Sequence, residues 1–278
     1  MQDEAFSSID IVSQCLIDEP RTLAFEEAIA STVNKDDIVI DIGTGSGIMA
    51  LFAARSGAKE VYALEYDSYL AKIANNNFKN NNFQNIKELL AGDARGFKYP
   101  EDLKFSVVVM EMLTTGMVDE YQVQAINNLH KQNKVSSETK FIPQVQNTFV
   151  SLVNSSSDMY GLKLKMVKHL WNNLSQNLRP VVMSENELLN SVDFRKPSGD
   201  ICDVEISLIA NKDGLVNGIL LTSETVLTDS IVLKDTETLN APVIVPIDDI
   251  EVKKGDVLKI RVSYKFGDGY GNFSIKIV

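Results

Sequence analysis

The sequence predicts an α/β fold, in which a domain built on a parallel β-sheet is followed by an antiparallel β-barrel or sandwich. Three observations carry this prediction. Strand and helix patterns alternate from about residue 38 to residue 142, which is typical of a parallel sheet with helices on both faces. A glycine-rich turn follows the first apolar strand directly. The second half consists of β-branched segments separated by glycine turns.

Two short helices are expected before the first strand. Apolar residues at three- and four-residue spacing share one face of the first helix: Ile9, Val12, Leu16 and Ile17. Pro20 suits the first turn of a second helix that runs to about Val33. Arg21 lies near the start of that helix, where a cation is not favoured. It is therefore either a surface arginine or the partner of an anion, such as Asp18 or the carboxylate of a ligand.

The first strand, Ile38–Ile42, is an apolar run that ends in the turn Gly43-Thr44-Gly45-Ser46-Gly47. Three glycines at alternate positions let the backbone turn sharply and approach a ligand closely. The helix that starts at Gly47 points its free amide groups at that ligand. A dinucleotide site prefers G-x-G-x-x-G, whereas this chain reads D-x-G-x-G-x-G from Asp41. That pattern is typical of S-adenosylmethionine-dependent methyltransferases with a Rossmann-like sheet; the alternative is a glycine turn in an ordinary sheet protein.

Carboxylates follow the next strands. The second strand ends at Glu65, which can accept hydrogen bonds from both hydroxyls of a ribose. The third leads to Asp93 and Ala94, where Asp93 is either an acceptor for an adenine amino group or a plain turn residue. The fourth, predicted over Phe105–Met110, ends at Glu111. Ligands of parallel sheets bind at the carboxyl ends of the strands, so chemistry is expected at this rim.

Glu111 and Glu120 stand nine residues apart, on either side of a loop that follows the fourth strand. A loop of this length can bring both carboxylates to one pocket. A guanidinium is planar and presents paired N–H donors, so two glutamates could hold it on two sides. Methyl transfer then needs mainly an in-line approach at near-contact distance. The alternative for Glu120 is a solvated acid at a helix start, where acids are favoured anyway.

Composition limits the partners and the compartment. The net charge of −11 repels phosphate backbones, so we expect no nucleic acid, and it attracts a basic peptide or protein or a cationic small molecule. We expect no membrane span, because no run of about 18 apolar residues occurs, and no signal peptide is visible. Two cysteines are compatible with a cytoplasmic protein. The two histidines, His130 and His169, belong to no motif, so no metal site is expected.

The pattern of the sequence changes near Phe141, and this change predicts two domains. Residues 1–142 are expected to hold the N-terminal helices and the cofactor-binding sheet. Residues 143–278 are expected to form a β-barrel-like domain. A helical insertion is expected near residues 157–190, around Trp171. The apolar residues of that helix fit packing on its own barrel.

In three segments the chain resembles the protein arginine methyltransferases, which are class I methyltransferases with a C-terminal β-barrel. Residues 15–22 are similar to the family segment M-L-x-D-x-x-R-T, and Arg21 falls on the arginine that contacts the cofactor carboxylate there. The stretch from Asp41 to Glu65 resembles the cofactor motif and its following helix. Glu111 and Glu120 match the family's two-glutamate loop. The resemblance implies that these two glutamates bind the substrate guanidinium and that an arm from the barrel makes a homodimer.

The predicted site combines the strand-end pattern with this resemblance. Glu111 and Glu120 are the predicted catalytic residues. The cofactor is S-adenosyl-L-methionine, and the residues expected to bind it are Arg21, Asp41, Gly43, Thr44, Gly45, Gly47, Ile48, Glu65, Asp93, Ala94 and Glu111.

The chain departs from the family at four places. Only Phe6 stands where the family has an aromatic Y-F-x-x-Y lid, and the S-E-W-M-G wording is replaced by residues 110–114, Met-Glu-Met-Leu-Thr. An adenine-side glutamate falls on Arg95. The T-H-W loop has Thr238-Leu239-Asn240 as its counterpart, which keeps only the threonine.

The sequence therefore predicts an S-adenosylmethionine-dependent methyltransferase that methylates a nitrogen of a guanidino or arginine-type acceptor. One alternative is a small-molecule or peptide methyltransferase on the same frame. The other is a binding protein that keeps the cofactor fold without chemistry. The intact pair of glutamates favours an enzyme, and Leu239 with Asn240 favours the binding protein.

Overall fold

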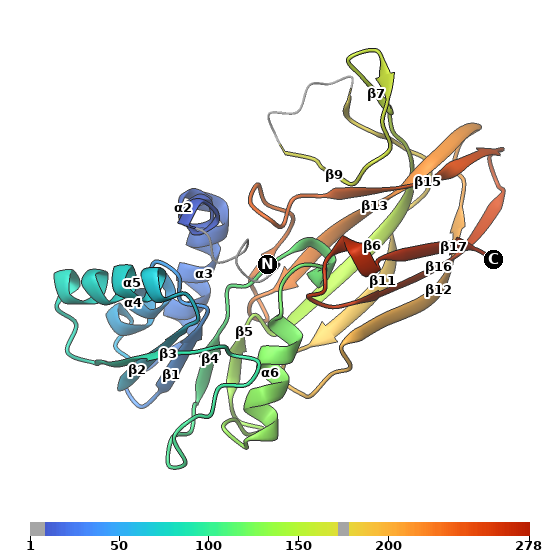
Figure 1. Cartoon of the computed structure of the whole chain (residues 1–278). Helices are drawn as coiled ribbons and strands as arrows, with labels where there is room; N and C mark the ends of the chain where they lie inside the picture. Colours follow the sequence, from blue (N-terminus) through green and yellow to red (C-terminus); the bar gives the residue numbers. More distant parts are fainter. Residues whose placement is uncertain (1–8, 172–177) are drawn as a thin grey trace.

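The chain consists of two halves of different architecture (Figure 1). The computed structural model describes residues 9–171 and 178–278. The first half holds a parallel sheet with helices around it, and the second half holds antiparallel sheets. Phe6, the one residue of the predicted aromatic lid, lies outside the described residues.

The parallel sheet has five strands in the order β3-β2-β1-β4-β5, and each neighbouring pair is parallel. The strands are β1 (Ile38–Ile42), β2 (Glu60–Glu65), β3 (Ile86–Ala91), β4 (Val107–Val109) and β5 (Lys140–Ile142). This confirms the predicted α/β half. The strand order reverses between β1 and β4, which places a crevice at their carboxyl ends. Strand β4 is shorter than the predicted Phe105–Met110, because the amide of Phe105 already bonds the carbonyl of Lys134 in the loop before β5.

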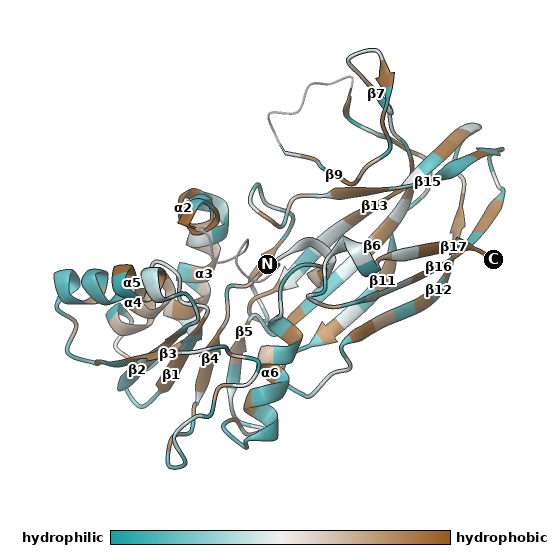
Figure 2. Ribbon diagram, in the orientation of Figure 1, coloured by the Kyte–Doolittle hydropathy of each residue, from teal (hydrophilic) through white to brown (hydrophobic). Residues whose placement is uncertain are grey.

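Alternate residues of the central strands face two different cores. Helices α3, α4 and α5 cover one face of the sheet, and α6 lies on the other (Figure 1). Val39 and Val109 pack with the first set of helices, whereas Ile40 and Val108 pack toward α6. The strands are accordingly apolar where they lie between the helices in Figure 2. The helices are α2 (Ile9–Ile17), α3 (Glu19–Thr32), α4 (Ile48–Arg55), α5 (Ser68–Asn81) and α6 (Gln122–Lys131), with a short 3-10 turn, η1 (Thr115–Met117).

The second half is a sandwich of antiparallel sheets rather than a closed barrel. A seven-stranded sheet runs in the order β10-β6-β13-β15-β9, with β11 and β14 paired to β6 and β13, and a three-stranded sheet runs β12-β16-β17. Among the described residues only an isolated bridge, Ser184 to Ala210, joins the two sheets, so the barrel alternative is wrong. Their inner faces share one core, in which Ile219 of β13 and Ile260 of β16 are fully buried.

The bounds of these strands are β6 (Val145–Asn154), β7 (Asp158–Met159), β8 (Leu162–Lys163), β9 (Lys168–His169), β10 (Val181–Val182), β11 (Glu187–Asp193), β12 (Ile201–Ile209), β13 (Gly214–Val226), β14 (Val232–Leu233), β15 (Val243–Val252), β16 (Val257–Lys265) and β17 (Ser274–Ile277). A second 3-10 turn, η3 (Tyr270–Asn272), precedes β17.

The helical insertion predicted near residues 157–190 is wrong for the residues described there. Short strands stand in its place: β7 and β8 form a hairpin, and β9 pairs with β15. The hairpin turns at Tyr160 and Gly161, both in the left-handed region, which breaks any helix. This hairpin projects from the sandwich in Figure 1. Among the described residues, no helix is both long and apolar enough to cross a membrane.

Candidate active site

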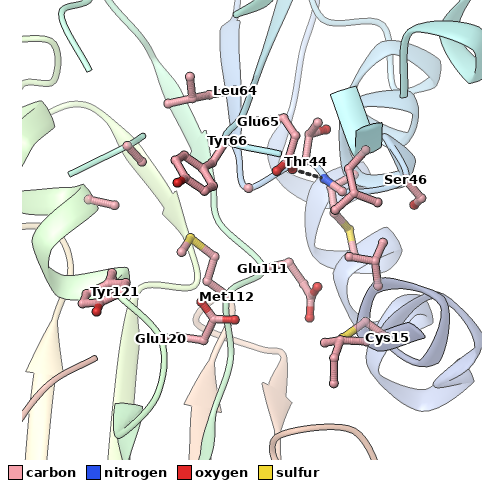
Figure 3. Close-up of a pocket in the computed structure, with 18 of the residues that line it drawn as sticks. Cys15, Thr44, Ser46, Leu64, Glu65, Tyr66, Glu111, Met112, Glu120 and Tyr121 are labelled. Carbon is pink, nitrogen blue, oxygen red and sulfur yellow. Dashed lines mark hydrogen bonds between the residues drawn. The ribbon is translucent and has the colours of Figure 1, made fainter. Parts of the chain in front are cut away.

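One large cavity opens at the carboxyl ends of β1, β2 and β4, where the strand order reverses. It holds roughly 1210 Å³, counting its open mouth. Its walls come from the glycine loop, the ends of the strands, helix α2 and one residue of the second half, Leu239. Figure 3 shows Glu65 on one side of this space and the carboxylates of Glu111 and Glu120 pointing into it. The cavity is where the sequence places the chemistry.

The glycine loop takes the shape that its spacing predicts. Gly43, Gly45 and Gly47 all have positive φ, at 72°, 54° and 88°, a conformation that side chains disfavour. Gly43 and Gly45 line the cavity together with Thr44 and Ser46, and so do Ile48 and Met49 at the start of helix α4. The N-terminus of α4 therefore borders the cavity, with its amide groups directed to that end.

Two predicted cofactor residues lie behind the wall instead of on it. The carboxylate of Asp41 is 1% exposed and accepts from the hydroxyl of Thr44 at 2.5 Å and from the amide of Ala50 at 3.1 Å. Burial raises its pKa to about 7, although both hydrogen bonds oppose the rise. Asp41 thus ties the glycine loop to helix α4. Gly47 is needed for packing, because a Cβ there would stand 2.6 Å from Cε1 of Phe78.

Glu65 lies at the end of β2 and lines the cavity. One carboxylate oxygen accepts from the amide of Gly45 at 2.8 Å, the bond dashed in Figure 3, and the other accepts from the amide of Asp67 at 2.9 Å. A carboxylate offers about four acceptor sites. The backbone of Tyr66 also makes a hydrogen bond to this carboxylate, so at least one acceptor site remains for a donor in the cavity, such as a ribose hydroxyl.

Asp93 and Ala94 lie beside Glu65 along the cavity rim. The carboxylate of Asp93 is paired with the guanidinium of Arg95, with a shortest N–O distance of 2.6 Å. Arg95 also lies over the ring of Tyr121, 4.1 Å from its centroid. These contacts build one edge of the cavity from the loop after β3 and the start of α6. Arg95, on which a family glutamate falls, thus holds this edge together.

Arg21 is not a surface residue: it is 1% exposed and reaches into the cavity wall. Its guanidinium forms an ion pair with Glu111 and donates to the carbonyl oxygen of Thr238 at 2.6 Å. The Glu111 carboxylate raises the pKa of Arg21 against the opposing effect of burial, so the arginine stays charged. Arg21 and Glu111, predicted for different ligands, are thus brought together and balance each other's charge.

Glu120 differs from Glu111 because its carboxylate faces the cavity without a basic partner at ion-pair distance among the described residues. Burial raises its pKa to about 8; Arg21 opposes the rise, and the neighbouring carboxylates of Glu111, Asp119 and Glu65 add to it. Asp119 also lines the cavity, and burial raises its pKa to about 6. The carboxyl groups of the cavity with raised pKa values and no basic partner at ion-pair distance in the described structure therefore lie at the Asp119–Glu120 end.

Several residues of the cavity wall belong to none of the sequence motifs and were not predicted as site residues. Helix α2 contributes Ile11, Val12, Cys15 and Leu16. Val12 lies where a Cβ on Gly45 would meet it at 3.0 Å, so the helix rests directly on the glycine loop. Burial raises the pKa of Cys15 to about 12, against the opposing charge of Arg21, so its thiol stays protonated. The apolar helical face predicted for residues 9–17 was the sequence signal for this part of the cavity wall. From the sequence alone, that face indicated packing in the protein core.

Comparison with known proteins points to methyltransferases, as the geometry of the cavity does. The chain is 32% identical, over 94% of its length and 94% of the relative, to the uncharacterized protein MJ1452 of Methanocaldococcus jannaschii. The model of the ribosomal protein L11 methyltransferase family (PrmA) matches residues 21–146. The chain is also 25% identical to the probable protein arginine N-methyltransferase 1.2 of Arabidopsis thaliana, over 69% of this chain and 56% of that protein.

The fold agrees over the whole length. The Trypanosoma brucei PRMT1 enzyme–prozyme heterotetrameric complex with AdoHcy contains a chain that matches with a TM-score of 0.77 at 17% identity, covering 99% of this chain and 98% of that one. These matches show a class I S-adenosylmethionine-dependent methyltransferase that is similar to the protein arginine methyltransferases. This methyltransferase accordingly uses S-adenosyl-L-methionine as its cofactor.

The glycine loop of this methyltransferase allows a test of packing by Gly47→Ala. We expect a loss of stability on the order of 1–3 kcal/mol, because the new Cβ meets Phe78 at 2.6 Å and φ is 88°. Gly57→Ala is the matched control, since Gly57 has φ 87° and nothing within 4 Å of its Cβ. Urea unfolding measures both variants. Equal losses would show that the Phe78 contact is unimportant.

Glu120 generates a prediction on stability and pH. Its pKa is about 8 in the folded protein against an ordinary value of 4.5, so the folded state holds a proton that the unfolded state has released. This contribution to stability is full below about pH 4.5 and is lost as the pH rises to about 8. Glutamine does not ionise, so Glu120→Gln removes this loss of stability at high pH. The variant is expected to melt about 3 °C or more above the parent protein at pH 9 and at the same temperature as the parent protein at pH 5. Calorimetric melting at the two pH values measures the difference, and a variant that melts below the parent at pH 9 contradicts the assignment.

Proposed function

We propose that this methyltransferase transfers the methyl group to a nitrogen of a guanidino or arginine-type acceptor held between Glu111 and Glu120. The observation that carries the proposal is the convergence of both carboxylates, from the two ends of one loop, on the same cavity (Figure 3). Arg21 already pairs with Glu111, so Glu120, whose raised pKa of about 8 lets a bound cation ionise it near neutral pH, is the carboxyl group available to an acceptor cation. A planar guanidinium can donate to both groups at once.

The cofactor fits the other end of the cavity. Glu65 would accept from a ribose hydroxyl, since its protein donors, the amides of Gly45, Tyr66 and Asp67, leave acceptor capacity on the carboxylate. Gly43, Gly45 and the start of α4 leave space and amide groups beside it, and Asp93 with Ala94 would border the adenine. S-adenosyl-L-methionine, when bound, supplies the methyl group on a sulfonium. Arg21 is within the wall and charged, so it suits the cofactor carboxylate as well as Glu111.

The protein's own task in the transfer is to hold and orient the acceptor. Binding of a cation beside Glu120 favours the ionised carboxylate, which releases the proton that its pKa of about 8 retains at neutral pH. When the neighbouring N–H groups of the acceptor are held by the two glutamates, the nitrogen that receives the methyl group keeps its reactive face toward the methyl donor. Orientation of this kind supplies most of what methyl transfer requires.

A small-molecule or peptide acceptor other than arginine is the second candidate function. The observation that favours it is Leu239, which lines the cavity with an apolar side chain at the position of the histidine in the resembled T-H-W loop. Leu239 is also in the left-handed region, at φ 56°, so its place in the wall is fixed by the backbone of its loop. An apolar wall at the end of the cavity that would hold the acceptor suits a cation that is less extended than the guanidinium of arginine.

We also propose that the chain forms a homodimer through residues 158–171, which begin with the projecting β7–β8 hairpin, and that it works in the cytoplasm. Large apolar side chains of this segment are exposed: Tyr160, Leu162, Leu164, Met166 and Trp171. Helices α2 and α3 expose Ile17 and Leu23 on the other half. Two such apolar surfaces at opposite halves of one chain suit a head-to-tail pair. Both cysteines, Cys15 and Cys202, are free, as in a reducing compartment.

Radiolabelled S-adenosylmethionine tests the acceptor. The protein is incubated with an arginine-rich peptide and with the same peptide carrying lysine instead of arginine. Label is expected in the arginine peptide alone, and its rate of incorporation should rise with pH to about 8 as Glu120 ionises. Label in neither peptide, while calorimetry shows binding of S-adenosylhomocysteine, would overturn the arginine proposal in favour of the second candidate.

Two variants separate the acceptor end from the cofactor end. Glu120→Gln should lower transfer to the peptide by about 100-fold or more and leave S-adenosylhomocysteine binding within a few fold, because only the cation's partner is lost. Glu65→Ala should weaken S-adenosylhomocysteine binding by about tenfold or more through lost hydrogen bonds. Calorimetry and the label assay measure both. Full activity of Glu120→Gln would contradict the two-glutamate mechanism.

Sedimentation tests the homodimer. Leu162→Asp places a charge on the projecting hairpin and should shift the protein from dimer to monomer. Ile277→Asp, on an exposed apolar residue of β17 in the sandwich, is the control and should leave the dimer intact. A parent protein that sediments as a monomer at micromolar concentration would rule out the proposed pair.

A further inference from the structure

The loop between the two glutamates is bonded to the second half of the chain at every residue from Thr114 to Val118. The Thr115 amide donates to the carbonyl of Leu239 at 3.1 Å, and its hydroxyl donates to the carbonyl of Ala241 at 2.6 Å. Gln146 donates to the carbonyl of Thr114 at 2.9 Å. The sandwich thus holds the backbone that connects Glu111 with Glu120.

The loop needs such support because its backbone conformation is unfavourable. Gly116 and Met117 are consecutive left-handed residues, with φ of 72° and 53°. For Met117, a residue with a side chain, this region carries a conformational cost that surrounding contacts must offset. Met117 is fully buried, and a Cβ on Gly116 would lie 3.3 Å from Val118 and within 3.7 Å of Tyr264 and Leu221 of the second half.

Tyr264 makes the central contact. It lies in β16, is 2% exposed and donates its hydroxyl to the carbonyl of Gly116 at 2.9 Å. Its ring is fixed by stacking on Phe273, with centroids 4.7 Å apart, and by the edge of Phe266 at 5.6 Å. The other backbone group of Gly116, its amide, donates to the hydroxyl of Ser223 at 3.4 Å. Both polar groups of this glycine are therefore held by side chains of the sandwich.

The turn after β16 makes a second contact on the Glu120 side. The amide of Gly267 donates to the carbonyl of Met117 at 3.1 Å, and the amide of Gly269 donates to that of Val118 at 2.9 Å. A Cβ on Gly267 would stand 2.4 Å from the ring of Tyr121, the residue that follows Glu120. Strand β16 and its turn therefore fix the loop both at its midpoint and at the end that carries Glu120.

We propose that Tyr264 is a positioning residue for methyl transfer, which acts through Gly116 to hold Glu120 at the correct separation from Glu111. This inference rests on the proposed function for its kinetic effect, because it concerns the same pair of glutamates. The ordering of the loop by Tyr264 is a separate claim from the proposed function, because the order of the loop can be measured without any acceptor. Displacing a reacting group by about 1 Å costs up to 100-fold in rate, so one hydrogen bond at the loop's midpoint is sufficient to matter.

Tyr264→Phe removes only the hydroxyl and tests this. Tyr99→Phe is the matched control: Tyr99 is 4% exposed, and its hydroxyl has no hydrogen-bond partner in the described structure. The probes are radiolabelled S-adenosylmethionine and the arginine-rich peptide. For Tyr264→Phe we expect kcat to fall about tenfold with KM for S-adenosylmethionine within twofold, and amide exchange across residues 115–118 to quicken about tenfold. Tyr99→Phe should change neither.

The outcomes separate the two proposals. Unchanged exchange in Tyr264→Phe overturns the positioning role, and so does faster exchange with an unchanged kcat. Equal losses of kcat in Tyr264→Phe and Tyr99→Phe show a general effect of deleting buried hydroxyls and also overturn it. If the parent protein leaves the arginine peptide unlabelled, the arginine proposal fails, and the exchange difference alone decides whether Tyr264 orders the loop.

Ser223→Ala is the second variant, in case Tyr264→Phe does not fold. It removes the hydroxyl that accepts from the Gly116 amide and is expected to quicken exchange at the same residues, by less than Tyr264→Phe because the bond is longer. Exchange across residues 115–118 like that of the parent protein would overturn the inference.

Discussion

The buried ion pair between Arg21 and Glu111 is the interaction on which the site depends. It joins the helix that precedes the sheet to the end of the fourth strand, and through the carbonyl of Thr238 it reaches the second half of the chain. A buried charge is costly without a partner, so neither residue can be lost alone without a large penalty. The pair thus fixes the wall of the cavity and removes one negative charge from it, which leaves Glu120 as the carboxylate able to respond to a ligand.

The two carboxylates of the loop therefore have different environments, although the sequence presents them as equivalent. Burial raises the pKa of both carboxyl groups, but Glu111 is paired with Arg21, which opposes the rise, whereas Glu120 faces the cavity. Neighbouring carboxylates and burial act in the same direction on Glu120. Such a division is typical of sites where one acid supports the frame and the other meets the substrate. At the opposite end, Glu65 is held by backbone amides, and its remaining acceptor capacity faces the cavity.

Much of this arrangement could be predicted from local patterns. The glycine spacing, the acid at each strand end and the alternation of strands and helices depend on short segments, and these predictions hold for the parallel sheet and the cavity. The partner of Arg21 could not be predicted, because Glu111 lies 90 residues away and only the folded sheet brings them together. Asp41 and Gly47 match the motif in sequence, yet their side-chain positions face the protein interior, a distinction that spacing does not contain. The stretch near residues 157–190 was predicted as helix from its apolar residues, whereas left-handed Tyr160 and Gly161 turn its first part into the hairpin of β7 and β8.

The bond from Tyr264 to Gly116 spans 148 positions of the chain. Contacts so distant in sequence form late in folding, since the intervening segment must first be brought into place. A chain growing from the ribosome completes its parallel sheet long before β16 has been made. The parallel sheet can therefore form while the loop between Glu111 and Glu120 still lacks its hydrogen bonds to the second half, and that loop is ordered only once the last strands have been made.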